Sequence, residues 1–118
     1  MAVSRAFVDY VRDQLRPWSV VDARRMFSGE GLFRDSIMFA LVHDDTLYLR
    51  TDDGNVGDFT AAGMAPFSYA RGARQVALGY HQVPAEILDE SDRLAAWAAA
   101  AFAAALRRNA PRPRRRRA

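Results

Sequence analysis

The sequence predicts a two-layer α+β domain in which helices flank one antiparallel sheet. Three observations support this class: an amphipathic helical period near the N-terminus, a series of short β-rich runs separated by polar residues, and an alanine-rich helical segment near the C-terminus. The 118 residues are enough for one domain with a hydrophobic core, and the 50% hydrophobic content is typical of a globular protein.

The N-terminal segment has the period of a helix. Val3, Phe7, Val11 and Leu15 recur at every fourth position, with charged residues between them. This spacing places the four side chains on one face of an α-helix, and Pro17 is expected to end that helix. We therefore expect a first helix that packs on the sheet through this face.

The period changes after the first helix, where β-rich runs alternate with pairs of small or acidic residues. Short polar breaks between such runs favour an antiparallel meander, in which we expect three strands. The runs are 20–27, 31–34 together with 37–42, and 46–50, and the breaks are Ser28–Gly29, Asp35–Ser36 and Asp44–Asp45.

The second half of the chain predicts a short helix, a hairpin and a long helix. Gly63 closes the short helix, since glycine readily adopts the left-handed conformation that ends helices, and Pro84 suits the start of the last helix. Ser91 is a candidate second N-cap within that last helix. In chain order the segments are the helix entry 52–55, the helix 56–62, the hairpin strands 66–69 and 75–83, and the helix 85–107, which gives α-β(3)-α-β(2)-α.

Five sequence blocks occur together in the order of a known family. They are Ala-Arg-Arg-Met-Phe-Ser-Gly-Glu-Gly-Leu-Phe over 23–33, Met-Phe-Ala-Leu-Val over 38–42, Leu-Tyr-Leu-Arg-Thr-Asp over 47–52, Ala-Gly-Met-Ala-Pro-Phe-Ser-Tyr over 62–69, and Tyr-His-Gln-Val-Pro over 80–84, with Trp97 downstream. Over residues 4–106, the chain resembles the TfoX/Sxy N-terminal domain family. The resemblance implies the same element order, α-β(3)-α-β(2)-α, and a fold similar to that of secretion chaperones.

The resemblance also implies a class of function. The members that give the family its name look like regulators of natural competence, which assist a cAMP-receptor-type activator at certain promoters and carry a second, C-terminal domain. We expect the present chain to be a single-domain member without that second domain. Its role is then expected to be that of a non-enzymatic protein-interaction module, an accessory factor in transcription or competence-type regulation.

The net charge of +3 combines two oppositely charged parts. Residues 1–106 hold ten arginines and fourteen acids, whereas residues 107–118 hold seven arginines and no acid. We predict a domain over 1–106 and a disordered Arg/Pro-rich tail over 107–118. Non-specific nucleic-acid binding through the tail is the alternative function, and a solvated extension shaped by codon usage is the other interpretation. The tail arginines are Arg107, Arg108, Arg112, Arg114, Arg115, Arg116 and Arg117.

The stretch from Arg24 to Gly31 is the candidate partner-binding site. In the functional interpretation, a glycine loop frees backbone N–H groups beside two arginines for a protein partner or an anion. In the steric alternative, the glycines allow a bulge or tight turn while the neighbouring side chains fill the core. The candidate residues are Arg24, Arg25, Met26, Phe27, Gly29 and Gly31.

Several chemistries lack the residues that they need. The chain has no cysteine, which excludes disulfides, thiol catalysis and iron–sulfur clusters, and no nucleotide-binding glycine pattern. We expect no cofactor and no metal, because His43 and His81 are the only histidines and lack ligand spacing. No nucleophile elbow is present. An uncharacterised small-molecule enzyme remains an alternative, which a buried polar pocket with perturbed carboxylates or His81 would indicate.

Location and oligomeric state follow from the apolar segments. The longest apolar run, from Leu94 to Leu106, has thirteen residues, fewer than the ~20 of a membrane-spanning helix. Charged residues interrupt the N-terminal segment, unlike in a signal peptide, so we expect a cytoplasmic protein without membrane contact. Trp97, Phe102 and the alanine-rich helix face are expected to form a homodimer, or alternatively to cover the chain's own sheet.

Overall fold

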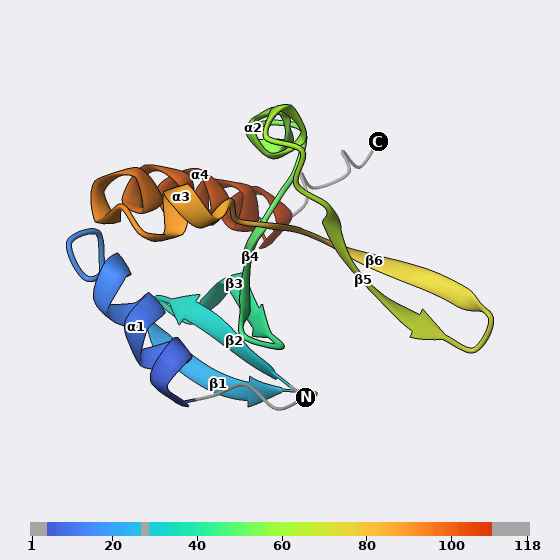
Figure 1. Ribbon diagram of the computed structural model, residues 1–118, viewed down its shortest axis with the longest axis horizontal. Helices are drawn as coiled ribbons and strands as arrows, with labels where there is room; N and C mark the ends of the chain where they lie inside the picture. The colour runs from blue at the N-terminus through green and yellow to red at the C-terminus, as the bar shows by residue number, and fades with distance from the viewer. Residues whose placement is uncertain (1–4, 27–28, 110–118) are drawn as a thin grey trace, which may run out of the picture.

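The computed structural model describes residues 5–26 and 29–109, which form one six-stranded antiparallel sheet with helices packed on it (Figure 1). The predicted α+β class is thus confirmed. In chain order the elements are α1 (Arg5–Leu15), β1 (Asp22–Met26), β2 (Gly29–Arg34), β3 (Ile37–His43), β4 (Thr46–Arg50), α2 (Val56–Ala61), β5 (Pro66–Arg71), β6 (Arg74–Gln82), α3 (Ala85–Leu88) and α4 (Ser91–Asn109).

The meander contains four strands, one more than the sequence analysis counted. The run that begins at residue 31 is divided by Asp35 and Ser36, whose φ angles are 50° and 66°. Positive φ at both central residues is what a two-residue hairpin turn needs, because its twist then matches that of the strands. Asp44 and Asp45 connect β3 to β4 in the same way, with φ angles of 55° and 54°. The observed order is therefore α-β(4)-α-β(2)-α-α.

β5 and β6 form a hairpin that joins the sheet over a short ladder. The sheet order is β1-β2-β3-β4-β6-β5, and β6 pairs with β4 through Tyr80, His81 and Gln82. The remainder of the hairpin extends away from the body of the domain (Figure 1). β1 and β5 are consequently the two edges of the sheet.

The core lies between one face of the sheet and the helices α1 and α4, which also contact each other. On α1, the predicted face is buried at Val11 and Leu15 and half-buried at Phe7, and Val8 is also fully buried. Val3 lies outside the described residues. Trp18, Phe39 and Phe102 form an aromatic cluster in which ring centroids lie 5.2–6.2 Å apart in edge-on contacts. Such contacts stabilise aromatic clusters beyond simple area burial.

The C-terminal helical region consists of two helices, α3 and α4. The hydroxyl of Ser91 donates to the carbonyl of Gln14 in α1 at 2.8 Å, so this serine connects two helices. α4 continues to Asn109, beyond the predicted domain end at residue 106. Arg107 and Arg108 thus lie on a helix and not in a tail.

Candidate functional site

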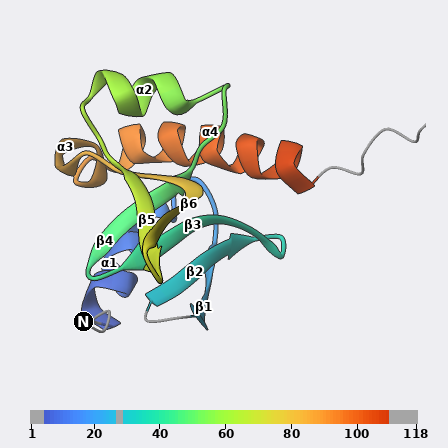
Figure 2. The same ribbon diagram turned by 90° about the vertical axis from the view of Figure 1, so that its right-hand side faces the viewer.

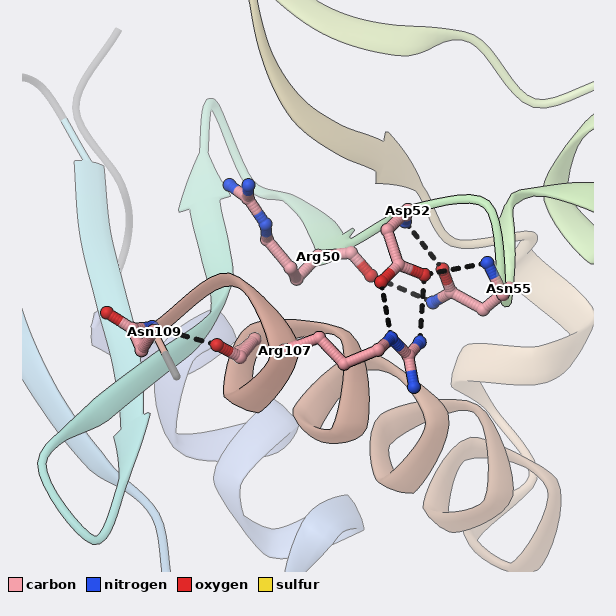
Figure 3. A network of polar contacts seen from close by, with 7 residues as sticks. Arg50, Asp52, Asn55, Arg107 and Asn109 are labelled. Carbon is pink, nitrogen blue, oxygen red and sulfur yellow. Dashed lines mark hydrogen bonds and ion pairs between the residues drawn. The ribbon is translucent and has the colours of Figure 1, made fainter. Parts of the chain in front are cut away.

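The last turns of α4 are fixed to the loop between β4 and α2 by an ion pair (Figure 3). Arg107 donates from Nε and Nη2 to the two carboxylate oxygens of Asp52, at 2.7 and 2.8 Å. Asn55 orders the loop, because its Oδ1 accepts from the Asp52 N–H at 2.8 Å and its Nδ2 donates to the Arg50 carbonyl at 2.9 Å. The hydrogen bonds between Arg107 and Asp52 lower the pKa of the carboxyl and raise the pKa of the guanidinium. The pair therefore stays charged at neutral pH and holds the end of α4 in place.

A cavity of about 320 Å³ lies where this end of α4 meets the ends of four strands. Arg50 from β4 and Arg108 from α4 line it, and none of the described residues that line it is acidic. The hydroxyl groups of Ser36 and Tyr80 and the side-chain amide of Asn109 make the rest of the lining partly polar. The other lining residues are Phe33, Ser36, Ile37, Met38, Tyr80, Ala105 and Asn109. We call this site the α4-end cavity.

Arg50 is the most constrained side chain of the α4-end cavity. It points away from the ion pair of Figure 3 and lies over the ring of Tyr80, with Cζ 5.1 Å from the ring centroid. Its Nη1 donates to the Leu78 carbonyl at 3.0 Å, whereas its Nε is buried and has no acceptor among the described residues. Gly79 provides the space, since a Cβ there would come within 3.3 Å of Arg50 Cζ. Burial raises the pKa of Tyr80 and the neighbouring Arg50 opposes that shift, so the hydroxyl is protonated at neutral pH.

A second candidate surface is the sheet face that turns away from the core. A Cβ at Gly31 would meet the sulfur atoms of two methionines and the ring of Phe33. The surface continues onto the next strands through Tyr48 and Phe67, whose ring centroids lie 4.9 Å apart. In Figure 2, which looks onto this face, α1 lies behind the strands. We call the surface the open face; its side chains, half-buried and outside the core cluster, are Met26, Phe33, Met38, Tyr48 and Phe67.

The two predicted partner-binding arginines project from opposite faces of β1, because neighbouring residues in a strand alternate. Arg24 lies on the open face, with Cζ 4.8 Å from the centroid of the Phe33 ring. Arg25 is paired in register with Glu30, whose carboxylate accepts from Arg5 of α1 at 2.7 Å. Both arginines are exposed, and Arg24 alone of the two borders the open face.

The structure places the two candidate glycines in β2 and not in a loop. Because β2 is paired with β1 on one side and β3 on the other, the N–H groups of Gly29 and Gly31 belong to strand ladders. A Cβ at Gly29 would overlap the carbonyl oxygen of Val42. Close packing within the strand thus accounts for both glycines. The bulge or tight turn of the steric alternative is not seen at either position. Of the other candidates, Met26 reaches the open face, and Phe27 lies outside the described residues.

A comparison with protein-family models shows which family the chain belongs to. The TfoX N-terminal domain matches residues 13–105. The chain belongs to the TfoX N-terminal domain family. No curated protein matches the sequence. The match includes every strand of the TfoX domain, and hence the open face, but it ends before Arg107, Arg108 and Asn109 at the end of α4.

Sequence reasoning did not find the α4-end cavity of this TfoX domain. Arg50 is one of 17 basic residues, and Arg108 was assigned to the tail. A weak signal was present in Gly79, an isolated glycine within a β-rich run, since such glycines often mark the close approach of another group. Among the predicted nucleic-acid contacts, Arg107 bonds to Asp52 and Arg108 lines the cavity. The remaining predicted contacts, Arg112, Arg114, Arg115, Arg116 and Arg117, lie outside the described residues.

The side chains expected at a homodimer contact cover the domain's own sheet. Trp97 packs edge-on against Phe59 of α2, with ring centroids 4.7 Å apart, and Phe102 belongs to the aromatic cluster with Trp18 and Phe39. Both are partly buried against the core. Packing within the protomer is what the alternative for these two side chains predicted, and the homodimer stays a prediction.

The histidine singled out as a sign of enzymatic chemistry lies apart from the α4-end cavity. His81 Nδ1 lies 2.9 Å from Thr51 Oγ1, and its ring packs against Phe59. Within residues 5–26 and 29–109, no three histidine or acidic side chains cluster as metal ligands would. Over the same residues, no helix combines the length and apolar character of a membrane span.

The environment of His81 predicts a pH dependence of stability. Burial lowers the pKa of His81 below its ordinary value of 6.5. As the pH falls below 6.5, the unfolded chain takes up a proton at His81 before the folded chain does, so stability decreases. His81→Asn keeps a hydrogen-bonding group for Thr51 but cannot titrate. We expect the melting temperature of the variant to fall less than that of the wild type between pH 7.5 and 5.5, and parallel curves would contradict this role.

Proposed function

We propose that this TfoX domain is a non-enzymatic, cytoplasmic protein-interaction module, an accessory factor in transcription or competence-type regulation that binds its protein partner through the open face. The family suggests the regulatory role. The observation that carries the proposal is the surface of aromatic and methionine side chains outside the core, bordered by Arg24. Aromatic residues, methionine and arginine are enriched in protein–protein interfaces, and a few such residues dominate binding energies.

The residues that line the α4-end cavity support the non-enzymatic part of the proposal. Of the described residues, those that line the cavity include no carboxylate and no histidine. General acid–base catalysis most often uses one of these groups within hydrogen-bond reach of the reacting atoms. His81, which has a shifted pKa, instead contacts Thr51 and Phe59.

Arg24 and Arg25 provide a matched test of the open face. Arg24→Ala should reduce partner binding at least about fivefold, as expected for an interface arginine worth more than 1 kcal/mol, whereas Arg25→Ala should leave binding unchanged. Both variants should melt within a few degrees of the wild type, because both side chains are exposed. The measurement is in-cell photocrosslinking from benzoylphenylalanine at position 67, on the open face.

Two controls make this experiment decisive. Benzoylphenylalanine at Tyr10, an exposed aromatic position on α1, should not capture the same partner. A crosslinked product with twice the mass of the chain would identify a second copy as the occupant, which is the homodimer alternative. If Arg24→Ala lowered the melting temperature by several degrees while crosslinking stayed intact, Arg24 would be structural and the proposal would be wrong.

A further inference from the structure

The α4-end cavity shares Phe33 and Met38 with the open face. It has the charge, the hydrogen-bond donors and the size of a small-molecule anion site. We propose that it binds a small phosphomonoester, with the phosphate group between Arg50 and Arg108 and the organic group against Phe33 and Met38. Nothing in the proposed partner-binding function requires this site.

The charge around the cavity favours an anion. Arg50, Arg107 and Arg108 lie at this end of the domain, and Asp52 is the carboxylate bonded there. Both Asp52 oxygens accept from Arg107, and Arg50 attracts the same carboxylate more weakly, so one acid stands against three arginines. Asp35, beside the lining residue Ser36, is exposed, and its carboxylate lies 4.0 Å from Arg34. A phosphate dianion would balance the two arginines.

The hydrogen-bond donors of Arg50 point to a planar, two-oxygen contact. Its Nη1 already donates to Leu78, but its Nε is buried without an acceptor among the described residues. A buried charged donor without an acceptor is unfavourable. A turn of the Arg50 guanidinium that brings Nε to a phosphate oxygen in the cavity would remove that cost. Guanidinium groups bind two phosphate oxygens through parallel N–H donors. Tyr80 and Asn109 supply further donors at the wall of the cavity.

Two structural features keep these groups in place. Gly79 leaves room for the Arg50 guanidinium above Tyr80, and the Arg107–Asp52 ion pair fixes the turn of α4 that carries Arg108 (Figure 3). Groups held before binding lose less conformational entropy when a ligand arrives.

The size and the remaining walls of the cavity select a small ligand. A volume of about 320 Å³ is at the lower end of the range for small-molecule pockets, and exceeds what a phosphate group alone would fill. Phe33, Ile37 and Met38 form a half-buried apolar wall beside the two arginines. A phosphate joined to a compact ring system would occupy both parts.

The test is an NMR titration of the ¹⁵N-labelled full chain at pH 7.5 and constant ionic strength, with inorganic phosphate and adenosine monophosphate as probes. We expect saturable shifts of the Arg50 side-chain Nε–H and of the backbone amides of Tyr80, Arg108 and Asn109. Adenosine monophosphate should bind more tightly than inorganic phosphate. Arg108→Ala should weaken binding at least about tenfold, as expected for the loss of a charge-assisted hydrogen bond.

Arg93→Ala is the matched control, because Arg93 is an exposed arginine on the same helix, in an i,i+3 pair with Glu90. It should leave binding unchanged. Arg50→Gln should weaken binding as strongly as Arg108→Ala. If Arg50→Gln also lowered the melting temperature, the proposal would be judged on the binding measured for Arg108→Ala. Shifts that grow without saturation, or an equal effect of Arg93→Ala, would overturn the proposal.

A second arm distinguishes the source of the phosphate group. A 12-base-pair DNA duplex is titrated against the wild type and against the full chain in which Arg112, Arg114, Arg115, Arg116 and Arg117 are replaced by serine. We expect the replaced chain to bind adenosine monophosphate as the wild type does. If only the duplex shifted the cavity resonances, and only with the five arginines present, the ligand would be nucleic acid and the proposal would be wrong.

Discussion

Replacing Phe39 by alanine should lower the free energy of unfolding by about 3–5 kcal/mol, the range for truncation of a fully buried aromatic side chain. Phe39 lies at the centre of the aromatic cluster, with ring centroids 5.2 Å from Trp18 and 6.2 Å from Phe102. Because these partners come from the α1–β1 connection and from α4, its removal loosens contacts between segments distant in sequence.

Urea denaturation followed by tryptophan fluorescence measures this loss, since Trp18 reports on the cavity that the substitution leaves. Phe67→Ala is the control, because Phe67 is a half-buried aromatic on the projecting hairpin and contacts Tyr48 and His43 outside the core. We expect it to cost less than about 1.5 kcal/mol. Equal losses in the two variants would show that the open face contributes as much to folding as the core does.

The local pattern predicted the elements because each one depends on neighbours in sequence. The period from Phe7 to Leu15 identified α1 and its buried face. The turn residues Asp35 and Ser36 marked a break correctly, but adjacent apolar runs on both sides were counted as one strand. Their positive φ angles make the break a complete hairpin turn, a distinction that composition alone does not give.

Phe39 is a residue whose burial the alternating pattern of a strand does not predict. Strict alternation would place Phe39 and Ala40 on opposite faces of β3, yet both belong to the core. The register shifts between Leu32 and Phe33, since Leu32 pairs with Ala40 and Phe33 with Met38. The extra residue on β3 is a β-bulge, which turns consecutive side chains toward one face. A bulge depends on the partner strand, so one strand's sequence does not predict it.

Of the two candidate surfaces, the sequence predicted part of the open face but not the α4-end cavity. The stretch around Arg24 was identified from the glycines that follow its two arginines, and the structure places Arg24 beside the open face. The α4-end cavity joins Arg50 to Arg108 and Tyr80, which lie far from it in sequence. These residues come together because β4 pairs with β6 in the sheet and because the Asp52–Arg107 ion pair fixes the end of α4. Neither contact produces a periodic pattern of residues that could be recognised in the sequence.

Replacing Gly29 by alanine should destabilise the domain by about 3 kcal/mol or more, the upper range for overpacking. The new Cβ would overlap the carbonyl oxygen of Val42, a backbone atom that cannot rotate away. β2 and β3 would have to separate near Gly29, where its pairing with His43 ends their ladder. Urea denaturation measures the loss, and amide hydrogen exchange should localise it to β1, β2 and β3.

Gly57→Ala is the matched control, since Gly57 lies in α2 with no atom within 4 Å of its added Cβ. Alanine favours the helix, so this variant should gain up to about 1 kcal/mol. If Gly29→Ala were as stable as the wild type, the steric account of the signature stretch would be wrong. Together with Arg24→Ala, the pair separates the two roles of that stretch. Gly29→Ala should lose stability and partner capture together, because β1 loosens, whereas Arg24→Ala should lose capture alone.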